Sequence, residues 1–334
     1  MKKHTSLLLV AFMAFGTAFA GNPDRAGSAG AGQLLINPWA ASNGLAGSNM
    51  ASVKGLESTF LNVAGLAFVE RTEIAFANSM SLGGTGISLN SLGFATKVGD
   101  SGVLGLSVTS MSLGDIPITT EDLPEGGIGS FSPAFSNIGV TYSKEFSNSI
   151  YGGLTMRIVS ESISNVRASG VCFDAGIRYV TGENDGLRFG IAPRNVGAPM
   201  SYAGDGLTVT ATPQRADEAL TVFQRSEKYE LPSLVNIGVA VDVVSNDNTV
   251  VTATGQFVSN SFTKDQFGGG LEANLGDRLV LRGGYLWEQG LIGGQDVTTA
   301  YTGPAGGIGL NLPAGEGATL KLDYSYRTTN PFNG

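Results

Sequence analysis

The chain has 334 residues, of which 49 are glycine and only 14% are charged, whereas an ordinary soluble domain has about 25% charged residues. The net charge of −8 comes without a basic patch, which excludes nucleic acid as a partner. The only histidine is His4, so the chain beyond its first residues has none for catalysis or metal binding, and we expect neither an enzyme nor a cofactor.

The N-terminus has the layout of a secretory signal. Lys2 and Lys3 precede an apolar run from Leu7 to Ala20, which ends in small residues before Gly21. About 14 apolar residues are too few to anchor a helix in a bilayer, which needs about 20. We therefore predict a signal peptide over residues 1–20. No later stretch offers 18 consecutive apolar residues, so the mature chain is expected to be either soluble or a β-barrel.

Residues 21–71 form a segment rich in glycine, alanine and serine. Small residues permit close approach of one backbone to another, whereas the leucines and Trp39 in this segment require burial. We expect the segment to plug the structure formed by the rest of the chain; a disordered periplasmic leader is the alternative. The candidate plug residues are Trp39, Gly44, Gly47, Asn62, Gly65 and Leu66.

From Thr72 onward, segments of about 8 to 12 residues alternate apolar with small or polar residues, as strands with two unlike faces do. One example is Leu104, Leu106 and Val108, which are separated by Gly105 and Ser107. The second face carries charges of both signs, which we expect to pair across a lumen. The main members of this predicted network are Arg157, Asp174, Arg178, Arg188, Asp242, Glu272, Arg282, Lys321 and Asp323.

Alternation is also compatible with a soluble β-sandwich, so the links between strands decide the fold class. Six short links are rich in turn-forming residues, and longer connections lie between them. The short links are at 98–102, 147–149, 182–186, 245–248, 275–278 and 313–317, and the long connections are at about 112–133, 160–169, 196–230, 260–264 and 289–300. Outer-membrane barrels place short turns in the periplasm and long loops outside. We therefore predict an all-β transmembrane barrel over residues 72–334 in the outer membrane of a diderm bacterium, with membrane lipid around it.

Six turns imply twelve strands, and a further strand at Thr72–Met80 makes about thirteen. Bacterial barrels use even strand numbers, so we predict about 14 strands. No apolar strand follows Asn330, so the last strand is expected to be missing from this sequence; closure by an N-terminal segment is the alternative.

The two longest outer connections present apolar residues beyond the membrane. Residues 207–211 and 220–223 are expected to form an extra hairpin, and the candidate partner-binding residues are Ile116, Ile118, Phe131, Tyr202 and Phe223. Loops folded inward over the barrel are the alternative. Asp115, Glu121, Asp122 and Glu125 form an acidic loop without recurring ligand spacing, so a solvated loop is favoured over a calcium site.

Two short motifs carry a family resemblance. Ala41-Ser-Asn-Gly-Leu-Ala-Gly47 and Asn62-Val-Ala-Gly-Leu66 resemble the N-terminal signature of the PorV/PorQ outer-membrane proteins of the type IX secretion system, which are relatives of the FadL-like fatty-acid transporter barrels. Val63 stands where that signature has proline, and Glu57 is the only acid of its acidic stretch. The resemblance implies a non-enzymatic barrel that binds the C-terminal domain of secreted cargo proteins or scaffolds other secretion-system proteins.

The alternative function is transport of hydrophobic small molecules, as in the FadL-like relatives. Such a transporter needs an apolar binding region. The inward strand residues are mostly charged or small, which favours the secretion hypothesis over transport.

Overall fold

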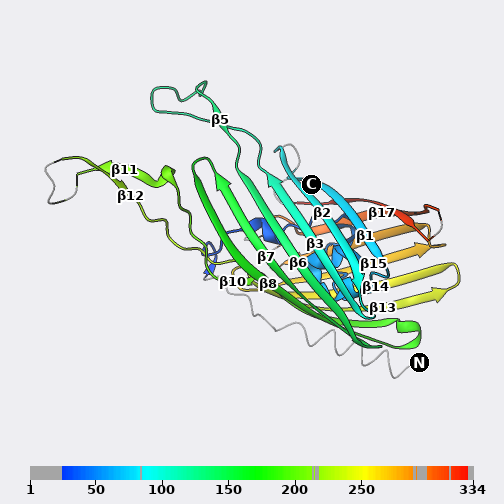
Figure 1. Ribbon diagram of the computed structural model, residues 1–334. Coiled ribbons are helices and arrows are strands. Elements are labelled where there is room, and N and C mark those ends of the chain that lie inside the picture. Colours follow the sequence, from blue (N-terminus) through cyan, green and yellow to red (C-terminus); the bar gives the residue numbers. More distant parts are fainter. Residues whose placement is uncertain are drawn as a thin grey trace.

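The computed structural model describes residues 25–82, 85–212, 214, 218–288, 291, 299–315 and 317–329. Within these residues the main element is a 14-stranded antiparallel sheet (Figure 1). Thirteen strands follow one another along one path, and β10 (Val196–Gly197) pairs with β8 outside that path. The path consists of β1 (Thr72–Ser81), β2 (Ile87–Val98), β3 (Gly102–Ser112), β6 (Ala134–Ser147), β7 (Ile150–Ile163), β8 (Val166–Thr181), β9 (Leu187–Arg194), β13 (Leu234–Asn246), β14 (Thr249–Asn260), β15 (Gln266–Leu275), β16 (Leu279–Glu288), β17 (Gly303–Pro313) and β18 (Thr319–Arg327).

This sheet confirms the predicted fold class and the count of thirteen strands. All six predicted short turns join neighbouring strands of the path, for example between β2 and β3 and between β17 and β18. Among the described residues, β1 pairs only with β2 and β18 only with β17. Residues 330–334, after which the closing strand was expected, lie outside the described residues, as does the predicted signal peptide.

One predicted long connection is wrong. Residues 160–169 are mostly paired strand, because β7 and β8 stay in register up to Ile163 and Val166 and turn between them. Outward positions near this turn hold serine and arginine rather than apolar residues, for example Ser160 opposite Ser169. The apolar period therefore ends before the strand pairing does.

The two faces of the sheet differ as the alternation predicted. Outward apolar side chains such as Leu106 and Ile177 are 47% and 55% exposed, because they face the surroundings of the barrel. Inward polar side chains such as Thr155 and Arg178 are fully buried. This inversion of a soluble protein's pattern is the pattern of a lipid-facing wall.

Two small hairpins extend from the long-loop end of the sheet. β4 (Ile116–Pro117) pairs with β5 (Ser130–Phe131), and β11 (Thr208–Ala211) pairs with β12 (Leu220–Phe223) at the predicted position. Figure 1 shows both hairpins projecting well beyond the strands.

The N-terminal plug consists of short helical turns. They are η3 (Gly32–Leu35), α2 (Ala40–Gly44), η4 (Gly55–Glu57), α3 (Ser58–Leu61) and η5 (Val63–Phe68). η4 contacts β1 and β2, η5 contacts β3, β6, β7 and β8, and α2 contacts β16, β17 and β18. The sheet therefore curls around this segment, and both ends of the path meet it. No described helix is long and apolar enough to cross a bilayer.

Candidate functional site at the interface of plug and wall

The inner wall meets the plug at glycines from nine strands. At each of them, an added Cβ atom would come within 3.1 Å of a plug atom. This glycine belt consists of Gly93, Gly105, Gly153, Gly176, Gly190, Gly238, Gly270, Gly284 and Gly307. These nine glycines thus have a structural role, because a side chain at any of them would occupy space that the plug fills.

At one of these contacts, glycine faces glycine. A Cβ atom on Gly44 of the plug would lie 3.0 Å from the Cα atom of Gly307 in β17. On the opposite side of the barrel, the Asn62 side chain caps η5 by accepting a hydrogen bond from the Ala64 amide, and its Nδ2 atom donates to the carbonyl oxygen of Ile177. Asn62 and Gly44 are therefore packing positions of the plug.

Three buried arginines of the wall hold plug carbonyl groups. Arg178 Nη2 donates to Val53, Arg157 Nη2 donates to Thr59 at 3.3 Å, and Arg194 Nη2 donates to Leu34 at 3.3 Å. In addition, the Arg178 guanidinium lies 5.1 Å from the ring centre of Phe68, and the Arg194 guanidinium lies 4.1 Å from that of Phe60. Such cation–π contacts strengthen when water is excluded, as it is here.

The lumen charges pair as complementary groups. Arg157 Nη2 lies 2.6 Å from Asp174 Oδ2, and Arg188 forms an ion pair with Asp242. Arg282 is shared, since its Nε atom lies 2.7 Å from Glu272 and its Nη1 atom lies 2.5 Å from Asp323. Of the predicted network, Arg178 and Lys321 have no carboxylate partner among the residues that the structure describes.

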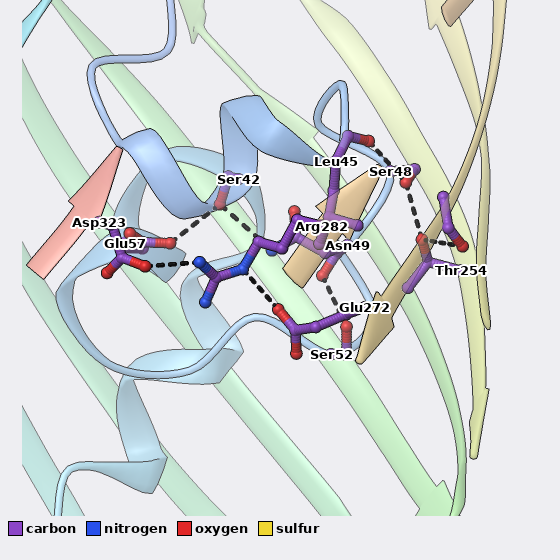
Figure 2. A network of polar contacts seen from close by, with 11 residues as sticks. Ser42, Leu45, Ser48, Asn49, Ser52, Glu57, Thr254, Glu272, Arg282 and Asp323 are labelled. Atoms are coloured by element: carbon purple, nitrogen blue, oxygen red, sulfur yellow. Dashed lines mark hydrogen bonds and ion pairs between the residues drawn. The ribbon is translucent and has the colours of Figure 1, made fainter. Parts of the chain in front are cut away.

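Glu57 lies next to the shared arginine, but among the residues that the structure describes it forms no ion pair of its own (Figure 2). Its carboxylate accepts a hydrogen bond from Ser42 Oγ at 3.1 Å, and Ser42 accepts one from Asn49 Nδ2 at 3.2 Å. Burial and the neighbouring Asp323 carboxylate raise the pKa of Glu57 to about 7, although Arg282 and Ser42 act in the opposite direction. Protonation of this plug residue is therefore coupled to the fit of plug and wall.

A second polar cluster joins the plug to the long outer loop. Glu161 of β7 is buried, and it accepts hydrogen bonds from Gln33 Nε2 at 2.9 Å, Tyr202 Oη at 2.5 Å and Tyr229 Oη at 2.8 Å. Burial and the bonds to Glu161 raise the pKa of both tyrosines, which keeps their hydroxyl groups protonated as donors. Glu161 thus connects the loop to the N-terminal segment.

The predicted site residues have three different placements. All six candidate plug residues are buried. Of the candidate partner-binding residues, Ile116 and Phe223 are 41% and 69% exposed on the outer hairpins, whereas Tyr202 is bound to Glu161. Ile118 is also exposed, and Phe131 is half-buried.

Several residues of the site were missed from the sequence. Glu161 fell in a segment predicted as a loop, and Arg194 was not considered as a lumen charge. Tyr229 and Gln33 carry no sequence signal, because only the folded loop and plug bring them to Glu161. No group of residues able to hold a metal ion occurs within the described part of the chain.

Comparison with solved structures finds proteins of similar architecture. The chain matches the CymD monoaromatic hydrocarbon channel with a TM-score of 0.52 and 13% identity, over 88% of this chain and 94% of that one. It matches the Pseudomonas putida toluene transporter TodX with a TM-score of 0.55 and 13% identity, over 87% and 92% of the two chains. The chain has the fold of these transporter barrels.

The chain also matches a FadL homologue from Pseudomonas aeruginosa, with a TM-score of 0.51 and 12% identity over 87% of this chain and 90% of that one. No protein-family profile matches the sequence, and no curated protein matches it either. The fold indicates an outer-membrane protein, and the matched structures are described as transport proteins or their homologues rather than as enzymes.

The predicted relationship to PorV/PorQ is wrong, because the matched structures are hydrocarbon and FadL-type transporter barrels. The predicted role in type IX secretion, with its secretion-system and cargo partners, is wrong with it. The two motifs that carried the resemblance supply Gly44 and Asn62, whose contacts are with the barrel wall. These small residues reflect the packing of a plug and do not identify the partner of the barrel.

Proposed function

We propose that the chain is an outer-membrane channel for hydrophobic small molecules, exported with a cleaved signal peptide. The observation that carries this proposal is the apolar contact surface between plug and wall, in a barrel with the fold of hydrocarbon transporters. An apolar solute can replace apolar contacts at this surface, whereas an ion or a sugar cannot.

Three apolar clusters make up that surface. One joins the plug to β9 and β13 through Met50, Val53, Ala192 and Ala240. Another joins it to β2 and β3, and the third joins the N-terminal segment to β7, β8 and the outer loop. The cluster at β2 and β3 consists of Leu56, Leu66, Val69, Ala95 and Val103. The cluster at β7, β8 and the outer loop consists of Ala31, Leu34, Val159, Ala168, Cys172, Met200 and Leu231.

These clusters remove the sequence argument against transport. The inner faces of the strands by themselves carry mostly charged or small residues. Leu34, Met50 and Leu66 come from the plug, so the apolar half of the interface is contributed by a segment outside the strands.

The test is uptake by whole cells, because the outer leaflet of the outer membrane is the barrier in question. A host that lacks its own hydrocarbon transporters is given labelled toluene, with and without production of the chain. We expect faster initial uptake with the chain and unchanged entry of a hydrophilic dye. Equal toluene uptake in both cultures contradicts the proposal.

A reversible lock tests the route. Ser48 Oγ of the plug lies 2.7 Å from Thr254 Oγ1 of β14, so cysteines at these two positions are close enough to form a disulfide. In the Ser48→Cys, Thr254→Cys variant, we expect oxidation to lower toluene uptake and reduction to restore it. The single variant Ser48→Cys is the matched control, because it has the same plug substitution without the cross-link.

A further inference from the structure

The plug has two parts with different neighbours. The glycines of the belt face plug residues between Gly44 and Leu66, which form the inner part. The outer part, residues 25–36, packs instead on β7, β8 and the outer loop, where Ala31 and Leu34 share an apolar cluster with Leu231. The two parts are therefore seated on different surfaces.

The outer loop holds the outer part of the plug through main-chain hydrogen bonds. Its two legs, residues 198–207 and 224–231, flank the projecting hairpin of β11 and β12 (Figure 1). In the second leg, the Glu230 amide donates to the Ser28 carbonyl oxygen at 3.1 Å, and the Glu230 carbonyl oxygen accepts a bond from the Gly30 amide at 2.9 Å. The second leg is thus paired with the plug.

The two legs are also joined to each other and to the wall. Met200 of the first leg and Tyr229 of the second exchange both main-chain hydrogen bonds, each 2.9 Å long. Ala203 of the first leg and Arg167, near the start of β8, form a second reciprocal pair, with bonds of 2.8 and 2.9 Å. The two legs and the outer part of the plug thus form one hydrogen-bonded unit on the wall.

One buried carboxylate of the wall binds all three members of this unit. Glu161 Oε1 accepts a hydrogen bond from Gln33 of the plug, and Oε2 accepts one from Tyr202 of the first leg and one from Tyr229 of the second. Hydrogen bonds to a charge are strong where water is excluded. Once one donor leaves, water reaches Glu161 and weakens the bonds of the other two.

We propose that the outer loop and residues 25–36 form a latch over the outer end of the lumen, which releases from Glu161 as a unit while the inner part of the plug stays on the glycine belt. Because β11 and β12 lie between the two legs, a contact on the projecting hairpin acts on both legs at once. The latch can thus be operated from the cell surface. The proposal does not depend on which compound crosses the barrel.

The chain contains a reporter for this motion. Cys172, its only cysteine, is fully buried beneath the latch in the cluster of Ala31, Leu34 and Met200. Its rate of labelling by N-ethylmaleimide, measured by mass spectrometry on the purified full chain in nonionic detergent at fixed pH, reports opening of the latch. Ala192→Cys is the matching reporter for the inner part, because Ala192 is buried in the cluster of Met50 and Leu61.

Variants of the anchor test whether the two parts move separately. Glu161→Gln is expected to speed labelling of Cys172 at least about tenfold, because hydrogen bonds to a charged group are stronger than those to an amide, and to leave labelling of Ala192→Cys unchanged. Tyr229→Phe removes one donor and keeps the ring, so it tests the same step with a smaller increase if Glu161→Gln fails to fold. Glu183→Gln, with the same charge change in the exposed turn between β8 and β9, is the control.

A lock tests the coupling without altering the plug. Arg167 and Ala203 are exposed, and reciprocally bonded residues have Cα atoms about 5.5 Å apart, which suits a disulfide. Oxidation of the Arg167→Cys, Ala203→Cys variant leaves Cys172 as the free thiol, and we expect its labelling to be at least about tenfold slower than after reduction. An equal rise at both reporters in Glu161→Gln, or the same Cys172 rate with and without the lock, overturns the proposal. If Glu161→Gln does not fold, an unchanged Cys172 rate in Tyr229→Phe overturns it.

Discussion

Two adjacent glycines in β16 allow a sharp test of the plug–wall fit. A Cβ atom on Gly284 would lie 2.8 Å from the Cα atom of Leu45 and closer still to the Leu45 carbonyl group. A Cβ atom on Gly283, which faces outward, would meet nothing within 4 Å. Because the obstructing atoms at Gly284 are backbone, Gly284→Ala forces the plug itself to shift.

Overpacking of this kind costs about 1–3 kcal/mol, which corresponds to a change of about 5- to 150-fold in an equilibrium. We therefore expect Gly284→Ala to increase the open fraction of the barrel by a factor in this range, and Gly283→Ala to leave it unchanged. The assay is the frequency and duration of ion-conducting openings in planar lipid bilayers. Indistinguishable conductance of the two variants would refute the idea that the glycine belt seats the plug.

Three further predictions concern the polar contacts. Burial favours the neutral form of Glu57 and raises its pKa from the ordinary 4.5 to about 7 in the docked plug. Plug docking should therefore be tightest below pH 4.5 and weaken as the pH rises toward 7. Bilayer conductance should rise over this window in the wild type and stay flat in Glu57→Gln. Asp174→Asn leaves Arg157 buried without its counter-ion and should cost about 3–5 kcal/mol in denaturant unfolding of the barrel, with Asp247→Asn in an exposed turn as the neutral control. Glu161→Gln weakens the bonds from the outer loop and plug, so hydrogen exchange of residues 198–207 should become faster; unchanged exchange would contradict the coupling.

The strands and turns could be predicted because each depends on local sequence. Alternation of Leu104, Leu106 and Val108 with small residues sets a lipid-facing and an inner face, and turn-forming residues mark every short link. Both signals lie within a few residues of one another. The pairing order then follows from hairpins between consecutive strands, which is why the strand count was correct.

The contacts of the plug could not be predicted in the same way. Glu161 meets Gln33 across 128 positions of sequence, and Arg178 meets Val53 across 125. Such pairs depend on the path of an irregular segment through the lumen, for which no periodic signal exists. The sequence showed the glycine belt only as a high glycine content. Its role depends on which glycines face inward at the same level of the barrel, and the fold determines that.

The incorrect functional assignment has a related cause. The motifs from Ala41 to Gly47 and from Asn62 to Leu66 record a requirement for small residues and a capping asparagine, which any plug packed against a bare wall shares. They contain little information about what the barrel transports or binds. The comparison of whole folds, over 87% of the chain for TodX, was needed to overturn the secretion hypothesis.

The most direct test of transport against secretion is to purify the barrel from native membranes and identify by mass spectrometry what remains bound. Our account predicts an apolar small molecule in the preparation and no protein partner in stoichiometric amount. A stable complex with secretion machinery or exported cargo, without a bound apolar compound, would contradict it.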